Sequence, residues 1–138
     1  MTRATKPQST TAPTIADFEA LAAEAYARLP AEFRDKSKDL LIRVEDFATD
    51  DVLEQLGIGN AYELLGLYHG VSLNNKSVMD LPRQPDMVFL YRRPMLEEWA
   101  ESGEELGDLI THVLVHEIGH HFGFSDDDME RIETAAGA

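Results

Sequence analysis

Residues 116–126 read HEIGHHFGFSD, a stretch that combines a helical pattern with closely spaced histidines and acids. On a helix, residues four apart lie one above the other on the same face. His116 and His120 can therefore direct two imidazoles at one metal ion. Glu117 is offset by one residue, which lets it reach a metal-bound water instead of the ion. The spacing predicts a metal site with a general base beside it.

A third ligand is expected just after this helix. Gly123 can adopt the left-handed conformation that ends a helix, so that the chain turns back and presents Asp126. Asp127 is the alternative ligand, although the helix dipole is enough to explain Asp127 and Asp128 at a helix start. Three protein ligands and one open position are typical of catalytic zinc. The chain has no cysteine, so His and carboxylate must hold the metal, and we expect Zn²⁺ on His116, His120 and Asp126.

Two further histidines lie close to the motif. His112 is one turn before His116 on the same face, where it either orients a ligand or is an ordinary surface histidine. His121 points in another direction, and we expect it to be structural or exposed to solvent rather than a ligand.

Tyr91, Arg92 and Arg93 follow a buried strand, just before a helix. One of them could stabilise an oxyanion or bind a substrate carboxylate. The alternative is that the arginines pair with some of the 26 acidic residues of the chain.

Composition limits the classes of protein to consider. A chain of 138 residues forms one domain, and its 43% hydrophobic residues suit an ordinary globular core. The net charge of −14 argues against nucleic acid as a partner, and no apolar run approaches the roughly 20 residues that span a bilayer. Residues 1–13 are rich in Thr, Pro and Ser without an apolar leader region, so we expect a disordered tail, a domain over residues 14–138, and a cytoplasmic protein.

Helix signals divide the chain into segments. Thr14 with Asp17, and Ser102 with Glu105, have the spacing of capping boxes. The second box is expected to open the motif helix, whose inner face is Leu106, Leu109, Ile110, Val113 and Leu114. The other predicted helices run from Thr14 to a stop at Pro30, from Thr49 to near Gly57, from Asn60 to Gly66, from Pro94 as first residue to Ser102, and from a cap at Ser125 with Asp128 to Ile132.

Three strands are predicted between these helices. Residues 40–46 alternate between apolar and polar, and residues 87–91 form a continuous apolar run. Residues 67–73 are a second strand candidate, followed by a turn at Asn74 and Asn75 and a loop over residues 76–86. The fold class is therefore α+β, with a small sheet of about three strands packed by helices and the motif on a C-terminal helix.

The residues resemble a family, the minimal zincin-like metallopeptidases of bacteria, whose signature reads H-E-x-G-H-H-x-G-x-x-D/S. Matching stretches are residues 65–71, residues 91–94 and residues 116–126, and the resemblance covers most of the chain after about Phe18. It implies a compact zincin-like core with zinc held by His116, His120 and Asp126. The family's acidic position is occupied here by an acid.

The leading function is hydrolysis of peptide or amide bonds by metal-activated water, with Glu117 as general base and a peptide or protein as substrate. One alternative is a metal-dependent ribonuclease of the rRNA-maturation type. The acidic charge and the presence of Glu117 argue against it. The other is a non-catalytic metal-binding interaction module, against which Glu117 also argues, because a structural ion gains nothing from a base.

Few residues follow Asp126 in this sequence, whereas larger zincins build the lower wall of the substrate cleft from a C-terminal subdomain. We therefore expect an open site that binds isolated peptides weakly. Selectivity would then come from a protein partner that completes the cleft or from a flexible protein segment.

Overall fold

A computed structural model describes residues 10–70 and 86–137. Six helices, a 3₁₀ turn and three strands in one small mixed sheet make up these residues, which confirms the predicted α+β class. Their order is α1 (Ile15–Ala27), α2 (Ala31–Lys36), β1 (Leu41–Glu45), α3 (Asp50–Leu56), η1 (Ala61–Glu63), β2 (Gly66–His69), β3 (Met87–Tyr91), α4 (Arg92–Ser102), α5 (Leu106–His121) and α6 (Asp126–Ala135).

The three strands form one mixed sheet in the order β1-β3-β2. β1 pairs parallel with β3, with Leu41 opposite Met87, and β2 pairs antiparallel with β3, with Tyr68 opposite Val88. β3 is central, as its continuous apolar sequence predicts, and Val88 and Leu90 have no exposed surface. Of the predicted strand over residues 67–73, the part after Gly70 lies outside the described residues, as do the Asn74-Asn75 turn and nearly all of the following loop.

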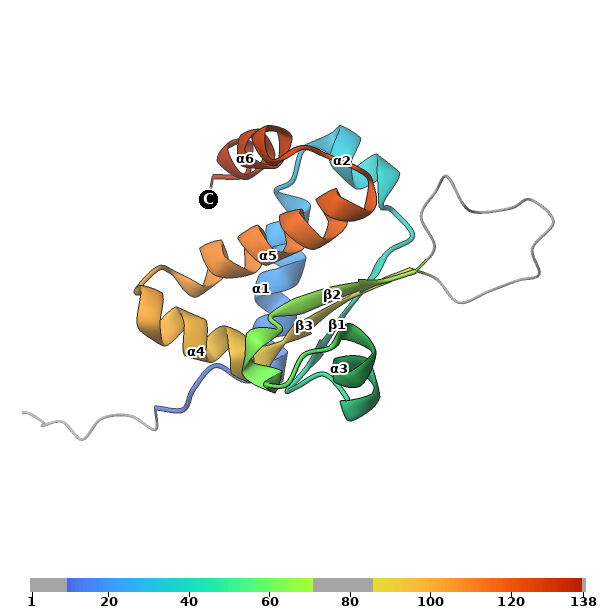
Figure 1. The fold of residues 1–138 in the computed structure, drawn as a ribbon. Helices are drawn as coiled ribbons and strands as arrows, with labels where there is room; N and C mark the ends of the chain where they lie inside the picture. The colour runs from blue at the N-terminus through green and yellow to red at the C-terminus, as the bar shows by residue number, and fades with distance from the viewer. Residues whose placement is uncertain (1–9, 71–85, 138) are drawn as a thin grey trace, which may run out of the picture.

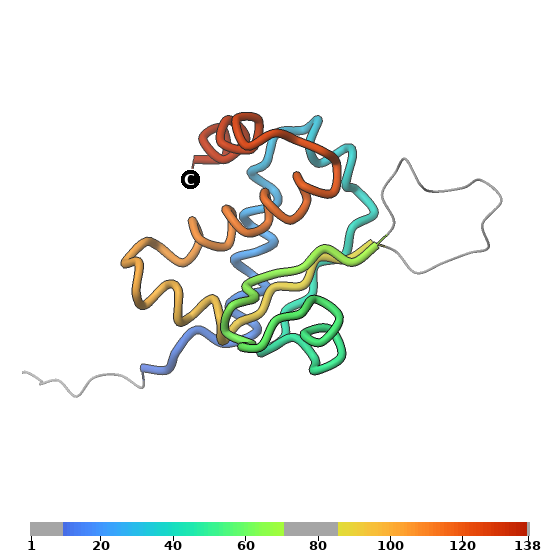
Figure 2. Tube along the Cα trace, in the orientation of Figure 1, coloured from blue at the N-terminus to red at the C-terminus, as the bar shows by residue number. Residues whose placement is uncertain are grey.

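The helices α1 and α5 cover the sheet. α5 packs against β2 and β3, and α1 packs against both α5 and β1. In Figure 1, α1 passes behind α5 and behind the strands. The predicted inner face of α5 is confirmed, since all five of its apolar residues are buried. The trace in Figure 2 shows the chain turning after α5 and returning as α6, which lies beside α2 and packs against α5.

Local signals set most helix ends. Thr14 and Ser125 form the predicted capping boxes, in which each hydroxyl accepts from the N–H three residues on. Thr49 caps α3, which ends at Gly57 in the left-handed region, and the Asn60 side chain accepts from the N–H of Tyr62. α6 continues to Ala135, three residues beyond the predicted end at Ile132.

Other boundaries also differ from the prediction. The helix predicted from Asn60 to Gly66 is a 3₁₀ turn that ends at Glu63, and Gly66 begins β2. α4 begins at Arg92, so Pro94 is its third residue, which costs nothing because the first four N–H groups of a helix lack helical partners. The Ser102–Glu105 capping box is wrong: Ser102 ends α4, Gly103 follows with φ 75°, and α5 begins at Leu106. Pro30 does not lead into a loop but is the N-cap of α2, a helix that was not predicted.

Within the two described segments, no helix is both long enough and apolar enough to cross a membrane.

Gly119 allows α6 to lie against α5. A Cβ added at Gly119 would lie 2.5 Å from Sδ and 2.9 Å from Cγ of Met129, a side chain with no exposed surface, whereas one added at Gly107 of the same helix would meet nothing within 4 Å. We predict that Gly119→Ala lowers the free energy of unfolding by about 1–3 kcal/mol through overpacking. Gly107→Ala is the control and is expected to raise it by up to about 1 kcal/mol. Urea unfolding of metal-free protein measures both, and equal midpoints would contradict the close packing.

Candidate metal centre

α5 carries three histidines on one face at successive turns. The ring centroids of His112 and His116 lie 4.1 Å apart, and those of His116 and His120 lie 5.8 Å apart with their planes at 86°. Zn–N bonds are about 2.0–2.1 Å long, so the rings of His116 and His120 can both reach an ion placed between them. The two rings are therefore neighbours on α5, and their role as metal ligands stays a prediction.

The chain reverses direction immediately after the histidines. Gly123 has φ 77°, in the left-handed region, as predicted for a residue that ends this helix. The N–H of Phe124 donates to the carbonyl of Gly119, and the N–H of Gly123 donates to that of His120. This pair of bonds is the Schellman arrangement, and it leads directly to the N-cap of α6.

The carboxylate that contacts the histidines is Glu133, on α6. Its Oε1 lies 2.8 Å from Nδ1 of His112, and its Oε2 lies 3.3 Å from Nε2 of His116. Asp126 is the first residue of α6 and is exposed, so its place as third ligand stays a prediction. Sequence reasoning missed Glu133, although Asp126, Met129 and Glu133 have the spacing of residues that share one helix face.

The donor atoms suit zinc. Burial lowers the pKa of His116, and the neighbouring His112 lowers it further, while Glu133 acts in the opposite direction. A neutral imidazole has a free lone pair for a metal ion. Imidazole nitrogens with one carboxylate make up a common zinc ligand set that leaves a position open, so the residues fit the expected ion.

Glu117 points toward the sheet rather than along the histidine face. Its Oε1 accepts from the N–H of Tyr68, at 3.2 Å. The N–H of Tyr91 donates to the carbonyl of Leu65, so these two residues form a hydrogen-bonded pair of the antiparallel ladder. Hydrogen-bonded pairs alternate with pairs whose N–H and C=O groups point away from the partner strand. The N–H and C=O of Tyr68 therefore point away from β3, toward the outer edge of β2. The carboxylate therefore lies at this edge. Burial raises its pKa, against the effects of the Tyr68 N–H and of His120.

Gly66 permits this approach of β2 to α5. A Cβ at Gly66 would lie 2.8 Å from Cγ1 of Val113 and 3.0 Å from the carbonyl oxygen of Phe89. Any larger residue would separate the edge strand from the helix that carries Glu117.

His121 is structural, as expected, and its side chain is only 9% exposed. Its ring stacks on Tyr68 with centroids 3.7 Å apart, and its Nε2 lies 3.8 Å from Asp86 Oδ2. The Tyr68 hydroxyl donates to the same carboxylate oxygen, at 3.1 Å. Burial, reinforced by Asp86, raises the pKa of Tyr68, so the phenol stays protonated. These contacts fix the end of α5 against β2.

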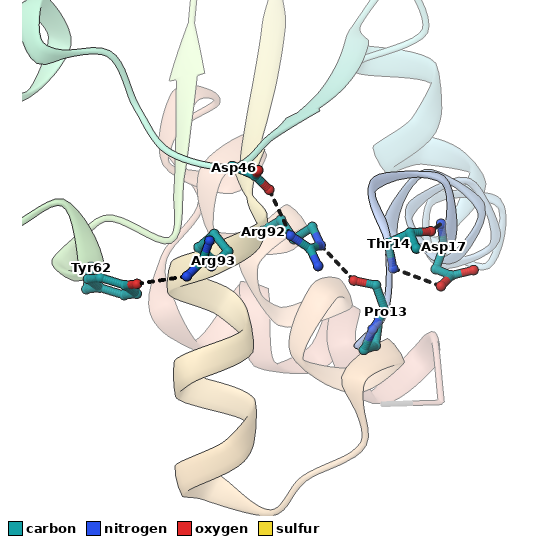
Figure 3. A network of polar contacts seen from close by, with 7 residues as sticks. All are labelled: Pro13, Thr14, Asp17, Asp46, Tyr62, Arg92 and Arg93. Carbon is teal, nitrogen blue, oxygen red and sulfur yellow. Dashed lines mark hydrogen bonds and ion pairs between the residues drawn. The ribbon is translucent and has the colours of Figure 1, made fainter. Parts of the chain in front are cut away.

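The arginines that follow β3 pair with groups elsewhere, as Figure 3 shows. Arg92 Nη1 lies 2.9 Å from Asp46, and its Nε donates to the carbonyl of Pro13, at 2.6 Å. Arg93 lies over the Phe47 ring, with Nη2 3.5 Å from the Tyr62 hydroxyl. Arg92 therefore follows the alternative of pairing with an acid, and these contacts join the start of α4 to β1 and α1.

Comparison with known proteins identifies the family. A search of curated proteins found no match. The model of the zincin-like metallopeptidase family matches residues 37–136, a range that contains the whole sheet, the histidine face of α5 and α6. Over that range the match includes every residue of the candidate metal centre, and the chain belongs to the zincin-like metallopeptidase family.

Proposed function

We propose that this protein is a zinc-dependent peptidase in which Glu117 is the general base. The observation that carries the proposal is the position of the Glu117 carboxylate, which accepts from the Tyr68 N–H at the outer edge of β2 and is influenced by the charge of His120. A base in that position would lie close to both the proposed metal ligand His120 and the backbone of the edge strand β2. A non-catalytic metal module has no need of a partly buried carboxylate there.

Zinc would be held by His116, His120 and Asp126, and when bound it supplies Lewis-acid polarisation of the carbonyl and activation of a water. Glu117 takes a proton from the water that attacks the peptide carbonyl and passes it to the leaving amine. The raised pKa of Glu117 suits this exchange, because a base works best when its pKa is close to the working pH.

The edge of β2 is the proposed binding site for the substrate backbone. β2 is the last strand in the order β1-β3-β2, so a peptide can add to it by strand pairing. The N–H of Tyr68, now bound by Glu117, lies on this edge. A peptide or protein substrate is thus brought to the base and to the metal site together. We also propose that a protein partner completes the cleft around this edge.

Glu117→Gln tests the base directly. We predict that the variant keeps about one zinc per chain but loses about 10²–10⁴-fold of its hydrolysis of a mixed peptide library. Glu97→Gln, at an exposed position on α4, is the control and should retain activity. His116→Ala should lose the zinc, measured by elemental analysis. Equal, low turnover in the wild type and in Glu117→Gln would favour a binding module instead.

A stability measurement separates loss of the base from loss of the fold. The raised pKa of Glu117 means that its ionised form is disfavoured in the folded state, so wild-type protein loses stability as the pH rises through that pKa. Glu117→Gln has no carboxyl group to ionise, so its stability does not fall with pH for this reason. In chelator at pH 7, Glu117→Gln is expected to unfold at the same urea concentration as wild type or a higher one, and a lower midpoint would contradict the cause given for the pKa shift.

Asp126→Asn and Asp127→Asn separate the two candidate third ligands. Both residues are exposed in the first turn of α6, so the two substitutions remove equal charge from equivalent surroundings. We predict that Asp126→Asn lowers peptide hydrolysis at least about 10-fold, as expected for loss of a metal ligand, while Asp127→Asn leaves it within about twofold. The reverse ranking of the two rates would assign the ligand to Asp127.

A further inference from the structure

His112, His116 and Glu133 converge without any contribution from His120 or Asp126. Each of the three offers one ligand atom, and these atoms lie within 4.8 Å of one another. The two oxygens of Glu133 face different rings, Oε1 toward His112 and Oε2 toward His116. The Glu133 side chain is only 17% exposed, so it is held in this position by its surroundings rather than extended into solvent.

We infer that α5 and α6 carry a second metal site, formed by His112, His116 and Glu133. This site binds a divalent cation such as Zn²⁺ or Co²⁺, and it is occupied when the proposed catalytic site is empty. It is called the upper site below, and the set His116, His120 and Asp126 is called the lower site.

The ligand chemistry supports this inference. Two histidines four residues apart with a carboxylate from another helix form a His₂Glu set, which zinc accepts with one position left open. For bonds of about 2.1 Å in a tetrahedron, ligand atoms lie roughly 3.4 Å apart. His112 Nδ1 lies 2.8 Å from Oε1 of Glu133, and His116 Nε2 lies 3.3 Å from Oε2. One ligand atom from each residue lies within 4.8 Å of the others, so the side chains must move together by about 1 Å to surround an ion.

The two sites exclude each other because both need His116. The pair His112 and His116 is centred one helical turn before the pair His116 and His120, a shift of about 6 Å along α5. Glu117 is one residue from the centre of the lower pair and three residues from the centre of the upper pair. An ion in the upper site therefore lies away from the base, and the upper site stores metal in a form that does not hydrolyse peptides.

The inference concerns metal binding and stands apart from the proposed function. His120→Ala removes the lower site and leaves the three upper ligands intact. We expect this variant to bind about one Zn²⁺ or Co²⁺ per chain. The double variant His120→Ala/Glu133→Gln should lose the ion. The matched control is His120→Ala/Glu130→Gln, since Glu130 is an exposed acid of the same helix, and it should bind the ion as His120→Ala does.

Metal content after dialysis and the absorption spectrum of bound Co²⁺ give the result, and circular dichroism of each metal-free variant checks that it is folded. Loss of metal in folded His120→Ala would overturn the inference, as would equal binding by the two double variants. Neither readout needs activity, so a protein without peptidase activity still tests the upper site. Absence of hydrolysis by zinc-loaded wild type would instead contradict the proposed function.

Discussion

The close packing of Gly119 against Met129 sets the distance between α5 and α6, and the rest of the metal centre depends on it. Because Gly119 has no side chain, the Met129 thioether occupies the space where a Cβ would lie. The Schellman turn through Gly123 and the Ser125 capping box then direct α6 back along the histidine face. Both candidate carboxylates, Asp126 and Glu133, are on this one helix, so a single packing contact positions the acidic half of the site.

The close approach of β2 to α5 positions Glu117. Gly66 brings β2 against α5, and this places the N–H of Tyr68 within reach of Glu117. The charged form of Glu117 is thereby held by one hydrogen bond in a partly buried setting that disfavours it, as its raised pKa reflects. Gly119 thus sets the approach of the α6 carboxylates to α5, and Gly66 sets the approach of Glu117 to the edge of β2.

Sequence patterns predicted the features whose causes are local. The apolar face of α5, the capping boxes at Thr14 and Ser125, and the apolar run of β3 all depend on residues within a few positions of one another. The prediction that Ser102 caps the motif helix was wrong because α4 ends at Ser102 and Gly103 follows it in the left-handed region. The Ser102 hydroxyl accepts from the N–H of Glu104, two residues on, and not from the N–H of Glu105. The contacts of Glu117 with Tyr68 and of Glu133 with the histidines join separate elements, and no periodicity within one segment encodes such a pairing.

The periodicity that makes the motif recognisable also makes it ambiguous. A helix places His112 and His116 in the same relation as His116 and His120, so the histidines alone do not specify where an ion binds along α5. The position of an ion along α5 therefore depends on the carboxylate that completes the site. Glu133 is largely buried and contacts two imidazoles, whereas Asp126 is exposed at the start of α6. Preorganisation favours Glu133. The proposed catalytic set with Asp126 contains His120 instead, whose charge also acts on the Glu117 carboxylate. If both proposed sites bind metal, they differ in that Glu133 already contacts two imidazoles, whereas the exposed Asp126 would have to turn toward His116 and His120.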